Sequence, residues 1–174
     1  QFTPSTEPPL LSYTEPKSAG TGNPGSLNTE TDSWTADWSA ALSSGSPYAN
    51  AWSLSQEIPF TFLFFGESAS QFQVNLNGLL NLNTASGVTH LLPSENNNLP
   101  SPSLPKSTIA CFWDAFPNLA ESSTRTVYYK TFGTSPNRQF WIKWNSMPIG
   151  NPYSTNTFAC VLEETTNKIY LVDM

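Results

Sequence analysis

The sequence is poor in charged residues, and especially in basic ones. Charged side chains make up 11% of the 174 residues, and seven Lys and Arg stand against 13 Asp and Glu, which gives a formal net charge of −6. Nucleic-acid-binding proteins need basic clusters that displace counterions from phosphates. We therefore expect no nucleic-acid partner and no electrostatic docking onto an anionic membrane.

Long hydrophobic runs are absent as well. No stretch approaches the roughly 20 apolar residues of a membrane-spanning helix, so we expect no membrane insertion. The chain starts at Gln1 without a charged leader and stops at Met174 inside an apolar run. Its uncharged, hydroxyl- and amide-rich composition is typical of secreted β proteins. We expect a processed secreted or cell-surface protein, or a module of a longer, multidomain one.

Few residues are suited to catalysis. His90 is the only histidine, which excludes a site built from several histidines and argues against a Ser-His-Asp system. The sequence has no G-x-S-x-G elbow, phosphate-binding loop or C-x-x-C pair. Glu163 and Glu164 are neighbours on a predicted strand and point to opposite faces, so they cannot act as a carboxylate pair. We expect a protein that is not an enzyme and needs no cofactor.

The chain contains two cysteines, Cys111 and Cys160. In "TIACFWD" Cys111 is in phase with Ile109 and Trp113, and in "TFACVLE" Cys160 is in phase with Phe158 and Leu162. Both side chains are therefore predicted to point into the core. Two alternatives follow: a buried disulfide between them, or two unreactive buried thiols.

The dominant pattern of the sequence is a series of short strands. We predict an all-β fold: an antiparallel, jelly-roll-like β-sandwich over residues 34–174, preceded by an irregular Pro/Gly/Ser/Thr-rich segment over 1–33. A short helical turn is expected at 35–42, with Thr35 as its cap. The predicted strand segments are "IPFTFLFF" (58–65), "QFQVNLNGLLNLN" (71–83), "TIACFWDAF" (108–116), "RTVYYKTF" (125–132), "RQFWIKWNSM" (138–147), "NTFACVLEE" (156–164) and "KIYLVDM" (168–174).

Turn residues between these strands predict hairpins. Asn77-Gly78 is typical of a type I′ turn, in which both central residues have positive φ. On both sides of this turn apolar residues alternate with amides, so we expect the asparagines to form the hydrated face of the hairpin. "GTSPN" and "TTN" predict two more hairpins, and Pro59 indicates the beginning of a strand or an edge strand.

Four blocks of the chain resemble the nidogen-like (NIDO-type) extracellular domain, in the same order. The blocks are "IPFTFLFFGESASQFQVNLNGLLNL", "STIACFWDAF", "RTVYYKTFGTSPNRQFWIKWNSM" and "NTFACVLEETTNKIYLVDM". The segments "KTFGTSPNRQFWIKW" and "VLEETTNKIYLVD" resemble a bacterial branch of this family, found in large secreted or cell-surface proteins of Bacteroidetes type. The resemblance covers about residues 54–174 and implies an extracellular β-rich module of adhesion or matrix proteins, without catalytic residues.

Two positions depart from the pattern of this family. Cys111 stands where members often have Pro, and Ala115 follows Asp114 where an acidic residue is often found. The second departure weakens a paired-carboxylate calcium site at this point. Calcium could instead use Glu30, Asp32 and Asp37, because loop carboxylates are the ligands that Ca²⁺ prefers; solvated acidic side chains fit the same pattern.

The aromatic residues suggest a binding surface. Trp141, Lys143 and Asn145 share one face of a predicted strand, and Tyr128 lies on the neighbouring one. If exposed, these residues form a flat platform for a sugar ring, with amides for its hydroxyls. Alternatively, both faces of the sheet are buried and the aromatics form a second layer of core.

Three further tryptophans lie between residues 34 and 52, and they pose the same choice. Trp34, Trp38 and Trp52 either wrap the sandwich or present their rings to a partner. The loops 85–107 and 146–156 are predicted to carry recognition.

Together these features predict a non-catalytic extracellular adhesion or matrix-interaction module that binds a protein or glycan partner. The alternatives are a carbohydrate-binding module attached to a secreted polysaccharide-degrading enzyme, and a spacer without a ligand. The carbohydrate-binding alternative requires an exposed Trp141 or Trp52.

Overall fold

The structure, a computed structural model, describes residues 38–43, 52–84, 98–102, 104–114, 125–148 and 155–174. Within these residues the chain forms nine strands, and no described segment is a helix long and apolar enough to cross a membrane. The strands are β1 (Ser39–Ser43), β2 (Gln56–Phe64), β3 (Glu67–Val74), β4 (Leu79–Asn81), β5 (Thr108–Ala110), β6 (Thr126–Phe132), β7 (Gln139–Pro148), β8 (Thr155–Glu163) and β9 (Ile169–Asp173).

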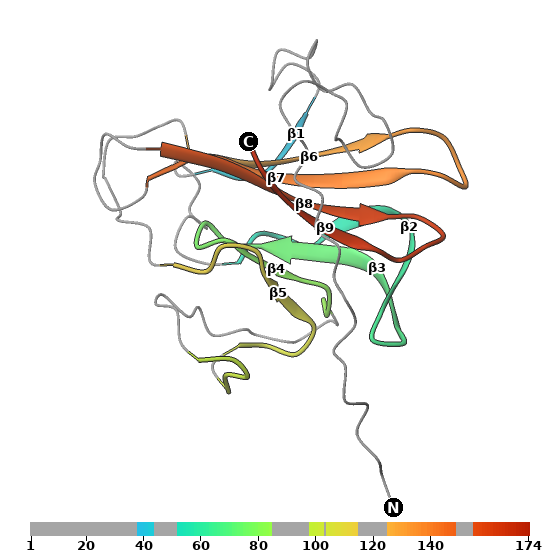
Figure 1. Ribbon diagram of the computed structural model, residues 1–174, viewed down its shortest axis with the longest axis horizontal. Coiled ribbons are helices and arrows are strands. Elements are labelled where there is room, and N and C mark those ends of the chain that lie inside the picture. Colours follow the sequence, from blue (N-terminus) through green and yellow to red (C-terminus); the bar gives the residue numbers. More distant parts are fainter. Residues whose placement is uncertain (1–37, 44–51, 85–97, 103, 115–124, 149–154) are drawn as a thin grey trace, which may run out of the picture.

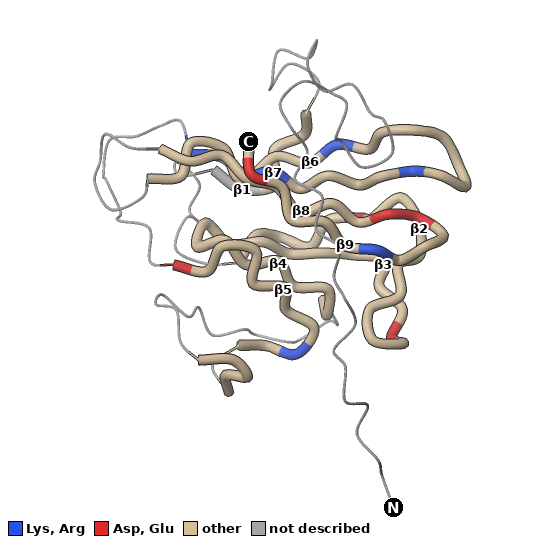
Figure 2. The backbone as a smooth tube through the Cα atoms, viewed as in Figure 1, with Lys and Arg blue, Asp and Glu red and all other residues tan. Residues whose placement is uncertain are grey.

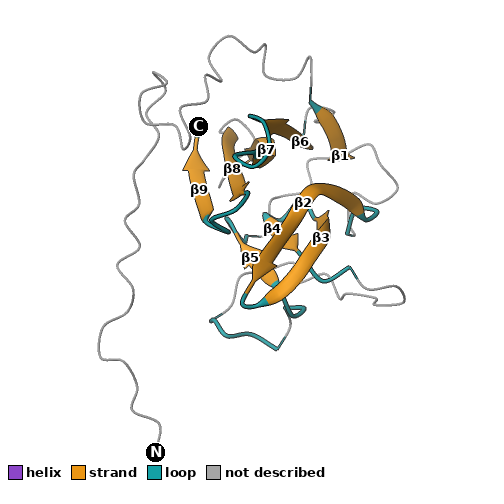
Figure 3. Cartoon of the chain, turned by 90° about the vertical axis from the view of Figure 1, so that its right-hand side faces the viewer, coloured by secondary structure: helices purple, strands orange, loops and turns teal. Residues whose placement is uncertain are grey.

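The described strands form two antiparallel sheets that stack face to face, so the predicted β-sandwich is confirmed (Figures 1 and 3). One sheet has the strand order β1-β6-β7-β8-β9 and the other β2-β3-β4-β5. Consecutive strands are neighbours in most of both sheets, whereas a jelly roll is built from crossing Greek keys. The sandwich thus consists of two meanders, with β1 added at one edge.

The hairpins predicted at "GTSPN" and "TTN" are present as the β6–β7 and β8–β9 connections. The helical turn expected at 35–42 is wrong for residues 39–42, because Ser39–Ser43 is strand β1 and pairs with β6, while its predicted cap, Thr35, lies outside the described residues. Helical propensity in a short polar segment is weak, and the exposed edge of β6 offers its backbone groups a ladder of partners instead.

The main core lies between the two sheets, as the alternation predicted. Phe62, Phe72 and Val74 of one sheet are fully buried against Ile142 and Trp144 of the other. Edge-to-face ring contacts join the layers, with ring centroids 5.3 Å apart for Phe72 and Phe140 and 5.5 Å apart for Phe72 and Tyr129. Each buried aromatic side chain stabilises the sandwich through its large apolar area.

Strand β2 is an edge strand, in agreement with the prediction from Pro59. The pairing of β2 with β3 shifts register between Glu57 and Phe62, so Pro59 lies where the regular ladder is interrupted. An edge strand tolerates a missing N–H because that group has no obligatory partner there.

The β3–β4 hairpin is present at Asn77-Gly78, but it is not the predicted type I′ turn. Gly78 has a positive φ of 78°, while Asn77 is not among the described residues with positive φ. The Asn75 side chain holds the turn in its conformation, since its Oδ1 accepts hydrogen bonds from the N–H groups of Asn77 and Leu79 at 3.1 Å each. This arrangement matches a three-residue loop that ends in a left-handed glycine.

The asparagines of this hairpin were predicted to face water, and for Asn75 and Asn81 this is wrong. Asn75 is 1% exposed and Asn81 is fully buried. Asn81 Nδ2 donates to the Lys106 carbonyl at 2.8 Å and to Thr108 Oγ1 at 2.9 Å. The segment before β5 therefore covers the outer face of β4, and the amide replaces its water contacts with these hydrogen bonds.

Candidate functional site

The predicted binding residues on β7 lie on the outer face of the five-stranded sheet, away from the main core. Trp141 is 1% exposed and packs there in a second apolar cluster with Trp38, Val161 and Val172. This finding corrects the exposed position considered for Trp141 and matches the alternative of a second core layer. The cover comes from Trp38, directly before β1, and from the ring of Phe132, whose centroid is 6.0 Å from that of Trp141.

Lys143 lies on the same face and is fully buried. Its Nζ atom is 4.3 Å from the ring centroid of Trp38 and 5.5 Å from that of Tyr128. A buried ammonium group loses its hydration, and the two aromatic faces offset part of that loss. Lys143 therefore holds Trp38 over the sheet, in place of the position beside a sugar that the sequence suggested.

The remaining predicted binding residues do not come together in one surface. Trp52 is 8% exposed and packs with Leu79 and Trp113 against the four-stranded sheet. Asn145 is partly buried, and its Nδ2 donates to Ser146 Oγ at 3.1 Å. Trp141 and Trp52 thus belong to two separate apolar clusters. A binding role would require their rings to be uncovered.

Several predicted residues lie outside the described part of the chain. These are the calcium candidates Glu30, Asp32 and Asp37, together with Trp34, His90 and most of the loops 85–107 and 146–156. Calcium binding at the three acidic residues stays a prediction. Among the described residues, no group of three or more His, Cys, Asp or Glu side chains could hold a metal ion.

Glu163 and Glu164 point to different sides of the chain, as predicted. The Tyr170 hydroxyl contacts the Glu163 carboxylate, at 3.4 Å from Oε2, on the outer face of the sheet. Burial raises the pKa of Tyr170, and the negative charge of Glu163 adds to that rise. Glu164 instead turns toward the β6–β7 hairpin, where Arg138 binds it.

Three described turns meet at one end of the sandwich, on the right in Figure 1. We call this surface the hairpin end, and it consists of residues 63–67, 133–138 and 164–168. Asn167 Oδ1 accepts a hydrogen bond from the N–H of Leu63 at 2.8 Å, and Thr165 Oγ1 donates to the Pro136 carbonyl at 2.6 Å. These bonds tie β2, β6–β7 and β8–β9 together, although the segments are far apart in sequence.

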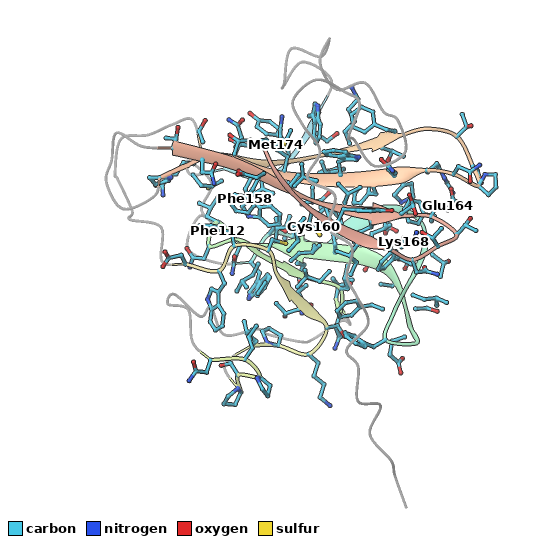
Figure 4. The ribbon with its side chains drawn as sticks, in the orientation of Figure 1. Phe112, Phe158, Cys160, Glu164, Lys168 and Met174 are labelled. Carbon is cyan, nitrogen blue, oxygen red and sulfur yellow. The ribbon has the colours of Figure 1, made fainter. Side chains whose placement is uncertain are left out.

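The strongest tie at the hairpin end is the ion pair between Arg138 and Glu164. Arg138 Nε donates to Glu164 Oε2 at 2.8 Å, and the second guanidinium nitrogen donates to Oε1 at 2.6 Å. The backbone adds two more bonds, because the N–H of each residue donates to the other: Arg138 to Oε2 at 3.1 Å and Glu164 to the Arg138 carbonyl at 2.9 Å. Figure 4 shows Glu164 at the end of β8, close to Lys168, and in Figure 2 acidic and basic stretches lie side by side at this end of the sandwich.

These hydrogen bonds, chiefly those from the Arg138 side chain, lower the pKa of Glu164 from 4.5 to about 2. Because the folded pKa lies below the unfolded one, this carboxylate stabilises the fold above about pH 4.5 and loses its contribution as the pH falls toward 2. We therefore expect the denaturant midpoint of the wild type to fall over this range more steeply than that of Glu164→Gln.

Urea titrations at several pH values would measure this difference, with Glu67→Gln as the control. Glu67 is an exposed carboxylate of the same hairpin end, so its variant should follow the wild type. Identical pH profiles for Glu164→Gln and the wild type would show that the Arg138 pair contributes nothing to acid stability.

Phe65 is the most exposed large apolar residue of the described chain, at 93%. Its backbone has a positive φ of 50°, next to Gly66 at 85°, and its ring lies edge-on to Phe64 with centroids 4.7 Å apart. Phe65 was not among the binding residues predicted from the sequence. The available signal was that it breaks the alternation of 58–64 directly before a turn glycine, where a core residue is not expected.

Cys111 and Cys160 both belong to the main core, as their phase predicted. Both are free thiols in the structure. They come from different sheets, yet the Cys111 side chain interacts with that of Cys160.

One protein-family model, described as NIDO related, matches residues 26–173. The match includes every described strand from β1 to β9. It agrees with the resemblance of the four sequence blocks, while their similarity to a bacterial branch stays a prediction. No curated protein and no solved structure matches the chain.

Proposed function

The chain belongs to the NIDO-related family, and from this premise we propose that it is a non-catalytic extracellular recognition module. In this proposal the module binds a protein partner through the hairpin end. The sandwich acts as a rigid scaffold, and the turns supply the contact surface.

The observation that supports this proposal is the exposed ring of Phe65 on a surface built to be rigid. The turns of the hairpin end are joined by side-chain hydrogen bonds and the Arg138–Glu164 pair. Phe65 and Thr165 adopt left-handed backbone conformations, which cost free energy for residues other than glycine. An exposed aromatic ring on a rigid turn is a typical anchor of a protein interface, because little backbone freedom is lost on binding.

The exposed side chains at this end favour a protein partner over a glycan. Phe65 and Leu63, which is 45% exposed, both belong to this end, so it offers an apolar anchor that suits a pocket in a partner protein. The carbohydrate-binding alternative required an exposed Trp141 or Trp52, and both rings are buried. That requirement is therefore not met.

The proposal is tested by probing an array of extracellular matrix proteins and glycans with the purified chain and two variants. Phe65→Ser should weaken binding to a protein ligand by roughly 10- to 100-fold, because a central aromatic anchor contributes about 2 kcal/mol or more. Leu54→Ser is the matched control: Leu54 is 61% exposed but precedes the opposite end of β2. It should bind like the wild type.

Equal binding by Phe65→Ser and the wild type would place recognition elsewhere on the module. Signals confined to glycans, and unchanged in both variants, would contradict the proposed partner class.

A further inference from the structure

Cys111 and Cys160 bring the two sheets together at one point of the core. Cys111 directly follows β5 in the four-stranded sheet, and Cys160 lies in β8 of the five-stranded sheet. Cys160 is fully buried in the main apolar cluster, and Cys111 packs against the same cluster. The Cys111 side chain interacts with that of Cys160, and its thiol also donates to the Ile109 carbonyl at 3.9 Å.

The backbone holds this juxtaposition in place. The N–H of Cys111 donates to the Gly78 carbonyl at 3.1 Å, which fixes the segment after β5 against the β3–β4 turn. The next residue, Phe112, packs on Phe158 with ring centroids 5.4 Å apart. Residues 111 and 112 therefore pack against residues 160 and 158. The contact between the cysteines is thus supported by the neighbouring contact between the two phenylalanine rings.

The pair lies close to the surface, one strand in from the sheet edge. Cys160 pairs with Leu171 of edge strand β9, and Leu171 is 40% exposed. Phe112, which is 38% exposed, comes from the other sheet and lies beside Phe158 of β8 (Figure 4). Opening of this edge would admit a small oxidant to the two sulfur atoms.

We propose that Cys111 and Cys160 form a disulfide bond that joins the two sheets when the protein folds in an oxidising compartment. The juxtaposition of the two cysteines does not depend on the proposed function, whereas the oxidising compartment rests on the extracellular location in that function. Disulfides persist outside the cell and are rare in the reducing cytosol.

The oxidation uses a disulfide such as oxidised glutathione as the electron acceptor. The thiolate of one cysteine attacks the glutathione disulfide, forms a mixed disulfide and releases one glutathione thiolate. The thiolate of the other cysteine then attacks the protein sulfur and releases the second glutathione. Two electrons pass from the cysteines to glutathione, and the two cysteine protons are balanced by protonation of the two released thiolates.

The environment of the thiols indicates when this reaction occurs. Burial raises the pKa of Cys111 well above its ordinary value, and the hydrogen bond and charge of Cys160 raise it further. The reactive thiolate is therefore scarce in the folded protein. The bond should form quickly during folding and slowly once the core has closed.

The test is refolding of the full chain from denaturant in a buffer of reduced and oxidised glutathione. The expected product is a monomer that has lost the mass of two hydrogen atoms and has no titratable thiol in denaturant. A peptide map without reductant should link the fragments that contain residues 111 and 160. Its melting temperature should exceed that of the reduced protein by roughly 5–15 °C.

The comparison with and without reductant needs only the wild-type chain, so it does not depend on a variant that folds. Cys111→Ala provides a second readout, because its melting temperature should not respond to reductant. A folded monomer with two free thiols after oxidative refolding would overturn the proposal. Disulfide-linked dimers in place of the internal bond would overturn it too.

The result is separable from the proposed function. Oxidation in vitro requires no binding partner, so a failed array leaves it unaffected. Trapping of thiols with iodoacetamide in the producing cells then tests the compartment. A pair that closes in vitro but is recovered fully reduced from cells and medium would contradict the extracellular location and leave the pairing intact.

Discussion

Replacement of Gly78 by alanine is expected to lower the free energy of unfolding by more than about 4 kcal/mol, or to prevent folding. A Cβ atom at this position would lie 2.1 Å from the carbonyl oxygen of Phe112 and 2.7 Å from its carbonyl carbon. These are backbone atoms, so no side-chain rotation relieves the clash. The positive φ of 78° adds the strain of a left-handed conformation, about 1–2 kcal/mol for alanine.

The matched control for this substitution is Gly66→Ala. Gly66 also has a positive φ, 85°, but a Cβ atom there meets nothing within 4 Å. Its variant should therefore lose only the conformational term, about 1–2 kcal/mol. Equilibrium denaturation in urea measures both, and equal losses for the two variants would contradict the tight approach of Phe112 to Gly78.

Trp141→Ala is expected to destabilise the protein by about 3–5 kcal/mol, as is usual for a large aromatic residue lost from a core. Trp141 is 1% exposed and is surrounded by Trp38, Ala159, Val161 and Val172. Its Nε1 atom also donates to Gln139 Oε1 at 3.2 Å. The substitution leaves a cavity in the outer layer and removes this hydrogen bond.

Phe65→Ser is the control that separates packing from recognition. Because Phe65 is 93% exposed, its replacement should change the free energy of unfolding by less than about 0.5 kcal/mol. The two substitutions thus have opposite expected effects: Trp141→Ala lowers stability, whereas Phe65→Ser weakens binding and leaves stability unchanged. An unchanged denaturation midpoint for Trp141→Ala would mean that its ring lies in solvent and would restore the sugar-platform interpretation.

The period-two alternation explains why the core was predictable from the sequence. A strand sends successive side chains to opposite faces, so Phe62, Val74 and Ile142 could be assigned to the interior without knowledge of their partners. The same rule placed Cys111 and Cys160 in the core. It could not reveal that they lie side by side, since their contact depends on how the two sheets are stacked.

The sequence was less informative about the second face of each sheet. Asn81 and Lys143 are polar, and polarity on the non-core face predicts exposure. Both are fully buried, because a distant segment covers each one: the chain before β5 lies over Asn81, and Trp38 lies over Lys143. Burial of this kind depends on contacts between segments that no local pattern encodes.

The turns show the same division. Asn77-Gly78 marked a hairpin in the correct place, because Gly tolerates positive φ. The turn type, however, is set by the hydrogen bonds of Asn75 and by the approach of Phe112 to Gly78. Likewise, nothing in the residues near Phe65 or Glu164 shows that they share one end of the molecule.

By itself, then, the amino-acid sequence determined that this chain folds as strands with an apolar face turned to the core, and that those faces meet in a sandwich. Local alternation suffices for this, because burial of apolar side chains drives the choice of face. Tertiary structure alone decided what covers the outer faces, which thiols touch and which ring stays in solvent. These outcomes depend on the stacking and strand order of two sheets, where residues distant in sequence compete for the same space.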